Sequence, residues 1–190
     1  MPRRRSARDT TWLLAGLALA TFARAAFNGD IPLTAFASGT AFALVLALLS
    51  LAAGWRPSTP RIRDLAIGAI GAAVLVVMPR LLHPTMPSVV GMRPEPFLAW
   101  ALVTSAVAIG EEVFLRGALF DAFDRSRGAA VAVAVTSVAF ALMHVPLYGW
   151  QVVPLDLGVG LFFAGLRLVT GGVAAPAMAH VLADLSTWWL

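Results

Sequence analysis

Long apolar stretches separated by short polar segments run along the whole chain. A helix needs about 20 mostly apolar residues to cross the hydrocarbon core of a bilayer. This criterion predicts seven spanning helices, at 12–27, 31–54, 64–82, 97–120, 129–147, 154–169 and 172–189. No internal repeat or flexible linker divides the series. The pattern therefore predicts an all-α polytopic membrane protein that forms one integral membrane domain over residues 1–190.

The composition favours the same class of protein. The chain is 59% hydrophobic and 13% charged, with a mean hydropathy of +0.83, against about 45–50% and about 25% in average soluble domains. With this composition, a soluble domain of the same length would have too few polar residues to cover its surface. Cysteine is absent, which excludes disulfides, thiolate metal sites and a cysteine nucleophile. Any chemistry must therefore use carboxylates, histidines or hydroxyls.

The positions of the positive charges are typical of a membrane protein rather than of a nucleic-acid-binding protein. All 14 basic residues are arginines, and most lie in the short gaps between the predicted spans. Arginine-rich loops mark the cytoplasmic side of membrane proteins. One side of the predicted topology collects Arg3, Arg4, Arg5, Arg8, Arg56, Arg61, Arg63, Arg125, Arg127 and Arg167. This predicts a cytoplasmic N-terminus, an outer C-terminus and no nucleic-acid partner; the lack of lysine in a chain rich in Ala, Gly and Arg suggests a bacterial plasma membrane.

Two parts of the N-terminal half are ambiguous in the sequence. The arginines before a short apolar stretch, followed by Ala23-Arg24-Ala25, also fit a cleaved signal peptide over residues 1–27. That alternative leaves the orientation of the later spans unchanged. Five prolines within 79–96 predict an irregular connection between the third and fourth spans.

Ionisable groups inside a bilayer are costly, so each one marks a candidate functional site. On a helix, the i,i+4 spacing allows Glu112 to pair with Arg116, whereas Glu111 is rotated by about 100° and is left free. His180 and Asp184 share a helix face for the same reason. The candidates in the C-terminal half are Glu111, Glu112 and Arg116 in the fourth span, His144 in the fifth, and His180 and Asp184 in the seventh. We expect Glu111, His144 and His180 to converge in one polar cavity between these helices.

Other catalytic patterns are missing or weaker. The histidines lack the H-E-x-x-H spacing of zinc peptidases. Ser105, Ser137 and Ser186 lie within predicted spans, but none sits on a Gly-x-Ser-x-Gly elbow. A purely structural role remains open for Glu112 with Arg116 as a buried clamp, and for a buried histidine as a hydrogen-bonded core residue.

Three motifs in order on separate spans resemble a known family. Glu111-Glu112-Val-Phe-Leu-Arg116 resembles an EExxxR motif, Phe140-Ala-Leu-Met-His144 an FxxxH motif, and His180-Val-Leu-Ala-Asp184 an HxxxN/D motif. These are the motifs of the CPBP intramembrane proteases, also called the Abi or CAAX-protease family. The resemblance implies a catalytic core over 97–190, whereas residues 1–96 are read as N-terminal spans from hydropathy alone.

The resemblance implies an enzyme that hydrolyses a peptide bond of a membrane-associated protein or peptide. Glu111 would be the general base for water, His144 would assist it, and His180 with Asp184 would stabilise the oxyanion. Glu112, Arg116 and Phe140 in these motifs would have structural or orienting roles. Asp184 departs from the Asn of many members, so it must be protonated, orient His180 or bind a metal.

Cofactor use is open between two mechanisms. Glutamate catalysis without a cofactor is the favoured reading. The alternative is a Zn²⁺ ion held by Glu111, His144, His180 and Asp184, since two histidines with carboxylates can bind zinc and leave a position for water.

Two other classes of function compete with a protease. A non-catalytic membrane scaffold or bacteriocin-immunity protein of the same fold would be expected to have lost Glu111, His144 or His180, and all three are present. A small transporter would show inverted repeats, and none is visible. In a bacterium the substrate would be a peptide pheromone, a bacteriocin leader or a membrane-protein tail rather than a prenylated protein. The oligomeric state stays open.

The arginine distribution predicts the topology of the spans. Reporter fusions after residues 60, 90, 127 and 152 are expected to lie inside, outside, inside and outside the cell, in that order. Two adjacent fusions that report the same side would contradict the seven-span arrangement.

Overall fold

The structure, a computed structural model, describes residues 8–29, 32–82 and 96–189, and this part of the chain is helical with no strand. An all-α fold is therefore confirmed. Two short segments interrupt the α-helices: η1, a π-helical stretch at Val113–Leu119, and η2, a 3₁₀ turn at Trp150–Val152. The α-helices are α1 (Arg8–Phe27), α2 (Pro32–Ala52), α3 (Ile62–Leu82), α4 (Phe97–Glu112), α5 (Phe120–Arg127), α6 (Ala129–Tyr148), α7 (Val153–Thr170) and α8 (Ala174–Ser186).

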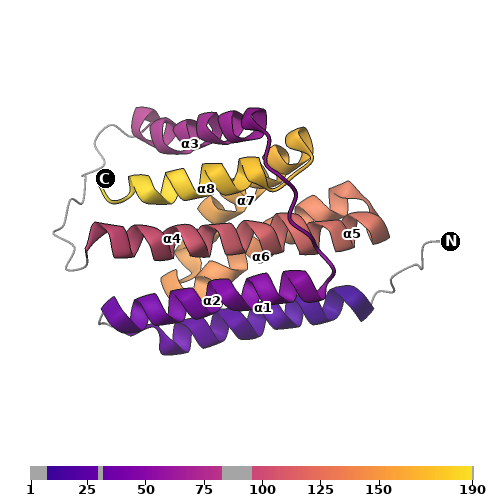
Figure 1. The fold of residues 1–190 in the computed structure, drawn as a ribbon, viewed down its shortest axis with the longest axis horizontal. Helices are drawn as coiled ribbons and strands as arrows, with labels where there is room; N and C mark the ends of the chain where they lie inside the picture. The colour runs from indigo at the N-terminus through magenta and orange to yellow at the C-terminus, as the bar shows by residue number, and fades with distance from the viewer. Residues whose placement is uncertain (1–7, 30–31, 83–95, 190) are drawn as a thin grey trace.

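The helices form a bundle with α4 at its centre (Figure 1). One side of α4 packs against α2, which pairs with α1, and the other side packs against α8, which pairs with α3. Helices α6 and α7 pack against each other and against the continuation of α4. The last turn of α4 therefore lies in the interior, where elements from both halves of the chain can reach it.

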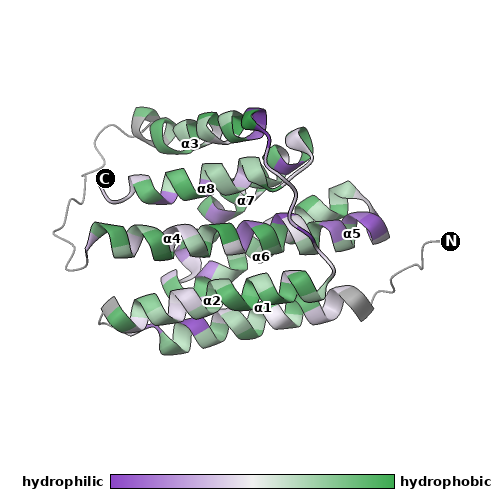
Figure 2. Ribbon diagram, in the orientation of Figure 1, coloured by the Kyte–Doolittle hydropathy of each residue, from purple (hydrophilic) through white to green (hydrophobic). Residues whose placement is uncertain are grey.

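The outer surface of the bundle is apolar, as a bilayer requires. Figure 2 shows hydrophobic residues along most of the helical ribbons, and large side chains such as Leu19, Leu33 and Leu98 are exposed. Helices also satisfy every backbone polar group inside a lipid phase. Five described segments are long and apolar enough to cross a membrane: Thr10–Phe27, Leu33–Ala52, Phe97–Arg127, Ala129–Tyr148 and Trp150–Thr170. The chain is thus a polytopic membrane protein.

The predicted boundaries differ from the structure at three places. The fourth span, predicted at 97–120, continues through η1 and α5 to Arg127 because the charged segment after residue 120 stays helical. The predicted seventh span at 172–189 contains α8, whose 13 residues are fewer than the about 20 of a spanning helix. Helix α3 runs to Leu82, so the predicted connection at 79–96 begins later, and its residues 83–95 lie outside the described part of the chain.

The short α8 is held in place by close packing against α3. Gly171, with a φ of 73°, ends α7 in a left-handed conformation and lets the chain turn back toward α8. On α3, a Cβ atom added at Gly68 would lie 2.5 Å from the carbonyl oxygen of Ala175 and 2.7 Å from Cβ of Met178. The absence of a side chain at this position therefore sets the distance between α3 and α8.

Gly68→Ala is expected to lower stability by about 1–3 kcal/mol, because the added methyl group meets backbone that cannot move alone. Thermal unfolding of the purified protein in detergent measures the effect. Gly165→Ala in α7 is the matched control, since nothing lies within 4 Å of a Cβ there, and it is expected to be neutral or slightly stabilising. Equal melting temperatures for the two variants would contradict the packing argument.

Candidate active site

The two adjacent glutamates lie at the end of α4, where the helix changes to the π-helical segment η1. Glu111 is 2% exposed and Glu112 is fully buried. The N–H of Phe120 donates to the carbonyls of Leu115 and Gly117. In an α-helix it would instead donate to the carbonyl of Arg116, four residues earlier. Such π-turns are rare and are found frequently at functional sites.

Helix α7 satisfies the backbone group that the π-turn leaves open. Nε of Arg167 donates a hydrogen bond of 2.9 Å to the carbonyl of Arg116, and its Nη2 bonds Oδ1 of Asp121 at 2.9 Å. In return, Nη2 of Arg116 donates to the carbonyl of Gly160 on α7 at 2.9 Å. The two arginines therefore fasten η1 and α7 to each other in both directions.

Arg116 is also the partner of the second glutamate. Its Nη1 donates to Oε1 of Glu112 at 2.9 Å, which is the i,i+4 ion pair that the spacing predicts. The guanidinium lies over the rings of Phe140 and Phe163, 4.8 and 5.3 Å from their centroids, and has no exposed surface. Charge pairing and aromatic packing together fix the orientation of this side chain.

His180 on α8 reaches both glutamates. Its Nδ1 lies 3.0 Å from Oε1 of Glu112, which also accepts the bond from Arg116. Its Nε2 lies 3.8 Å from Oε2 of Glu111 and 3.5 Å from Oδ2 of Asp184. The ring stacks on Phe163 with centroids 4.9 Å apart. Glu112 thus joins the EExxxR segment to α8, and Nε2 points to the two remaining carboxylates.

Glu111 is not unpaired, contrary to the prediction from helical spacing. Nη1 of Arg24, on the last turn of α1, donates to Oε1 of Glu111 at 3.3 Å. The guanidinium of Arg24 lies 4.8 Å from the ring centroid of Phe42 on α2. Each of the two glutamates therefore has its own arginine, one from the same helix and one from the N-terminal half.

His144 lies in the same region but has different polar partners. Its Nδ1 is 2.9 Å from the carbonyl of Phe140 and 3.4 Å from Oδ2 of Asp156 on α7. The ring of Phe140 lies 4.8 Å from that of His144 and 5.6 Å from that of His180. The two histidines therefore flank one phenyl ring, and His180 rather than His144 is the histidine that approaches Glu111.

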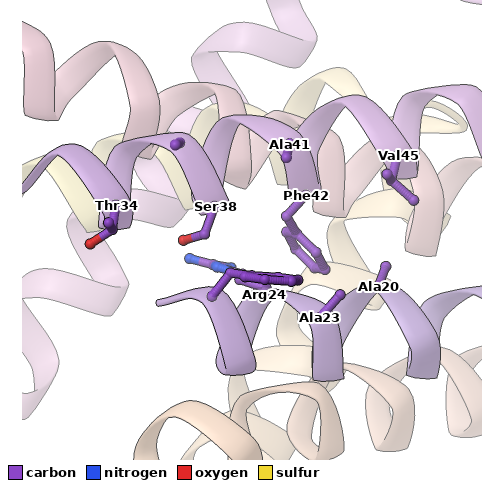
Figure 3. A pocket seen from close by; sticks show the side chains of 10 residues that line it. Ala20, Ala23, Arg24, Thr34, Ser38, Ala41, Phe42 and Val45 are labelled. Atoms are coloured by element: carbon purple, nitrogen blue, oxygen red, sulfur yellow. The ribbon is translucent and has the colours of Figure 1, made fainter. Parts of the chain in front are cut away.

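A cavity of about 400 Å³ lies between α1 and α2. Its walls include Ala23, Arg24, Ser38, Ala41 and Phe42, and Figure 3 shows the Arg24 guanidinium between the two helices, near Ser38. The cavity is mainly apolar and differs from the polar cavity expected around Glu111, His144 and His180, none of which lines it. Arg24 connects it to the glutamates.

The grouping of His, Asp and Glu side chains shows whether a metal ion could be held at the site. Within residues 8–29, 32–82 and 96–189, no three His, Asp or Glu side chains are arranged as a metal site. His144 makes its polar contacts with Phe140 and Asp156 through Nδ1, whereas His180 contacts Glu111, Glu112 and Asp184.

Comparison with known families covers the segment that contains all three motifs. Residues 93–186 match the family model described as type II CAAX prenyl endopeptidase Rce1-like. This part of the chain belongs to the Rce1-like family. No curated protein and no solved structure matches the chain. The Rce1-like segment contributes Glu111, Glu112, His144 and His180, whereas Arg24 lies outside it.

Sequence reasoning missed Arg24 and Asp156. Both are ionisable residues inside predicted spans, 12–27 and 154–169, which is the signal that marked the other candidates. Arg24 also fits the signal-peptide cleavage site described above, and Asp156 lies close to the start of its predicted span. Their partners are 87 and 12 residues away, so no local spacing reveals the pairs.

Two i,i+4 ion pairs in one continuous helix allow a matched test of burial. Arg116→Met removes the partner of a buried carboxylate and is expected to destabilise the protein by about 3–5 kcal/mol. Arg125→Met removes an exposed pair with Asp121, with atoms 3.9 Å apart, and is expected to cost at most about 1 kcal/mol. Unfolding in detergent with a denaturant gives both values, and similar losses for the two variants would contradict the clamp.

Proposed function

We propose that the chain is an intramembrane endopeptidase in which Glu111 activates a water molecule for attack on a peptide bond. The Rce1-like match supports a CAAX-type membrane endopeptidase in general. The observation that carries the specific mechanism is the arrangement of Glu111, which has Oε1 bound by Arg24 and Oε2 3.8 Å from Nε2 of His180. That distance is too long for a hydrogen bond, so Oε2 keeps its capacity to accept a proton from water.

In this mechanism Glu111 is the general base and then the general acid. Oε2 takes a proton as the water oxygen bonds to the carbonyl carbon of the substrate, giving a tetrahedral intermediate with a negative oxygen. Glu111 then passes the proton to the nitrogen of the leaving amine as the C–N bond breaks. A positioned carboxylate of this kind contributes about 10²–10⁴-fold to the rate.

His180 is the proposed donor to the negative oxygen. Its Nδ1 faces Glu112 at 3.0 Å, so only Nε2 is directed toward Glu111 and Asp184. To donate from both nitrogens the ring must be an imidazolium. The surroundings allow this form, because Nδ1 faces Glu112 at 3.0 Å and Nε2 lies 3.8 Å from Oε2 of Glu111 and 3.5 Å from Oδ2 of Asp184. One such donor is worth about 10²–10³ in kcat.

His144 is proposed to hold the water. Because its Nδ1 faces a backbone carbonyl at 2.9 Å, the proton is placed on Nδ1 and leaves Nε2 as an acceptor. Asp156, 3.4 Å from the same nitrogen, supports this tautomer. The ring can therefore accept a hydrogen bond from a water molecule near the glutamate.

The proposed setting is a bacterial plasma membrane with the N-terminus in the cytoplasm. The substrate is a membrane-embedded or membrane-associated polypeptide, because the buried glutamates lie within a bundle whose outer surface is apolar. The arginine-rich segments at 56–63 and 125–127 support this orientation.

Asp184 separates the metal-free mechanism from the zinc alternative. If Asp184 orients His180 or acts as a neutral donor, Asp184→Asn keeps the shape of the side chain, supplies an amide and is expected to retain activity within roughly tenfold, about 1.4 kcal/mol of barrier. Glu111→Gln is expected to abolish cleavage, since an amide cannot take the proton, while the protein still folds. Cleavage of a peptide library by purified protein, with and without a chelator, measures these effects.

The zinc content of the purified protein distinguishes the metal-free mechanism from a metalloprotease. Stoichiometric zinc that disappears together with activity in Asp184→Asn would replace the metal-free mechanism by a metalloprotease. Unchanged cleavage by Glu111→Gln would contradict both mechanisms. Absence of any cleavage by the wild-type protein, across the library and in lipid as well as detergent, would contradict the proposed activity.

A further inference from the structure

Arg24 is an arginine from the N-terminal half that reaches the candidate active site. It lies on α1, outside the Rce1-like segment, yet its Nη1 is 3.3 Å from Oε1 of Glu111. The side chain of Arg24 is 18% exposed and that of Glu111 is 2% exposed. The contact therefore joins a partly accessible cation to a buried carboxylate.

The ion pairs of the two glutamates indicate which carboxylate depends on Arg24. Glu112 already binds Arg116 and His180, both through its Oε1. Within the described residues, the basic side chains within 4 Å of the Glu111 carboxylate are Arg24 at 3.3 Å and His180 at 3.8 Å. A carboxylate that loses its partner in a low-dielectric interior is strongly disfavoured. Without Arg24, Glu111 would have to turn toward His180, whose Nε2 already faces Asp184.

The position of the Arg24 guanidinium is fixed by two helices. It lies over the ring of Phe42 at 4.8 Å, and the α1–α2 contact holds both side chains (Figure 3). An arginine with such a ring contact is held more rigidly than an exposed one. By holding Oε1, it leaves Oε2 as the atom that faces His180.

We propose that Arg24 is the positioning residue of Glu111, so that the active site is completed by a helix outside the Rce1-like segment. Arg24 fixes the carboxylate through Oε1 and presents Oε2 to water; it touches neither substrate nor the reacting atoms. This proposal rests on the proposed function, because it assigns Arg24 a role in the step that Glu111 performs.

The test uses full-length protein and a peptide that the wild type cleaves. Arg24→Met, which keeps the length of the side chain without its charge, is expected to lower kcat by about 100-fold, the size seen when a positioned catalytic group is misplaced. KM is expected to stay within roughly threefold, because substrate binding does not use Arg24. Arg24→Lys retains the charge and is expected to keep activity within about tenfold of the wild type. Arg125→Met, which removes a more exposed ion pair with Asp121, is the control and is expected to match the wild type in kcat.

Chemical rescue separates positioning from a merely structural role. Arg24 lines the cavity of about 400 Å³, so Arg24→Ala leaves space in which methylguanidinium can bind beside Glu111. Millimolar methylguanidinium is expected to restore several-fold activity to Arg24→Ala and none to Glu111→Gln. Thermal unfolding of each variant checks the fold, and if Arg24→Met fails to fold, Arg24→Lys and the rescue carry the test.

Three results would overturn the proposal while leaving the protease intact. They are a kcat of Arg24→Met within about threefold of the wild type, a loss confined to KM, or a folded Arg24→Ala that methylguanidinium does not rescue. An inactive wild type would instead remove the proposed function itself, so the two failures are distinguishable.

Discussion

Two adjacent carboxylates, buried at the centre of an apolar bundle, are the constraint on which the site depends. A single buried carboxylate is costly unless it is paired and hydrogen-bonded, and Glu111 and Glu112 come side by side at the end of α4. Successive helical residues point in directions about 100° apart, and each of the two glutamates pairs with a different arginine. Arg116 binds Glu112 from within the same helix, and Arg24 binds Glu111 from α1.

This constraint extends to the surrounding helices. The helix that carries Glu112 and Arg116 contains the π-turn of η1, and the carbonyl of Arg116 at that turn accepts a hydrogen bond from Arg167 of α7. Arg116 in turn binds the carbonyl of Gly160, which fixes α7 at this depth. Glu112 also holds His180 on α8, which packs on α3 at Gly68. Pairing of the glutamates thus links α1, α4, α7 and α8.

Sequence patterns were sufficient for what depends on local spacing. Apolar runs predicted the helices, and the i,i+4 rule predicted the Glu112–Arg116 pair and the shared face of His180 and Asp184, whose atoms lie 3.5 Å apart. The Rce1-like match confirms the family that the three motifs indicate. The π-turn was beyond this reasoning, because hydropathy is the same for an α-turn and a π-turn. Long-range pairs such as Arg24 with Glu111 depend on how helices dock, which no single-helix pattern encodes.

The central claim is that Glu112 organises the site by accepting the Nδ1–H of His180, and NMR of ¹⁵N-labelled histidine tests it most directly. The chain has three histidines, so the His180 signals can be assigned from spectra of His180→Asn. The account predicts a proton on Nδ1 of His180, shifted downfield by a hydrogen bond to a carboxylate and correlated with the Glu112 side chain. A His180 ring protonated at Nε2 alone would contradict it.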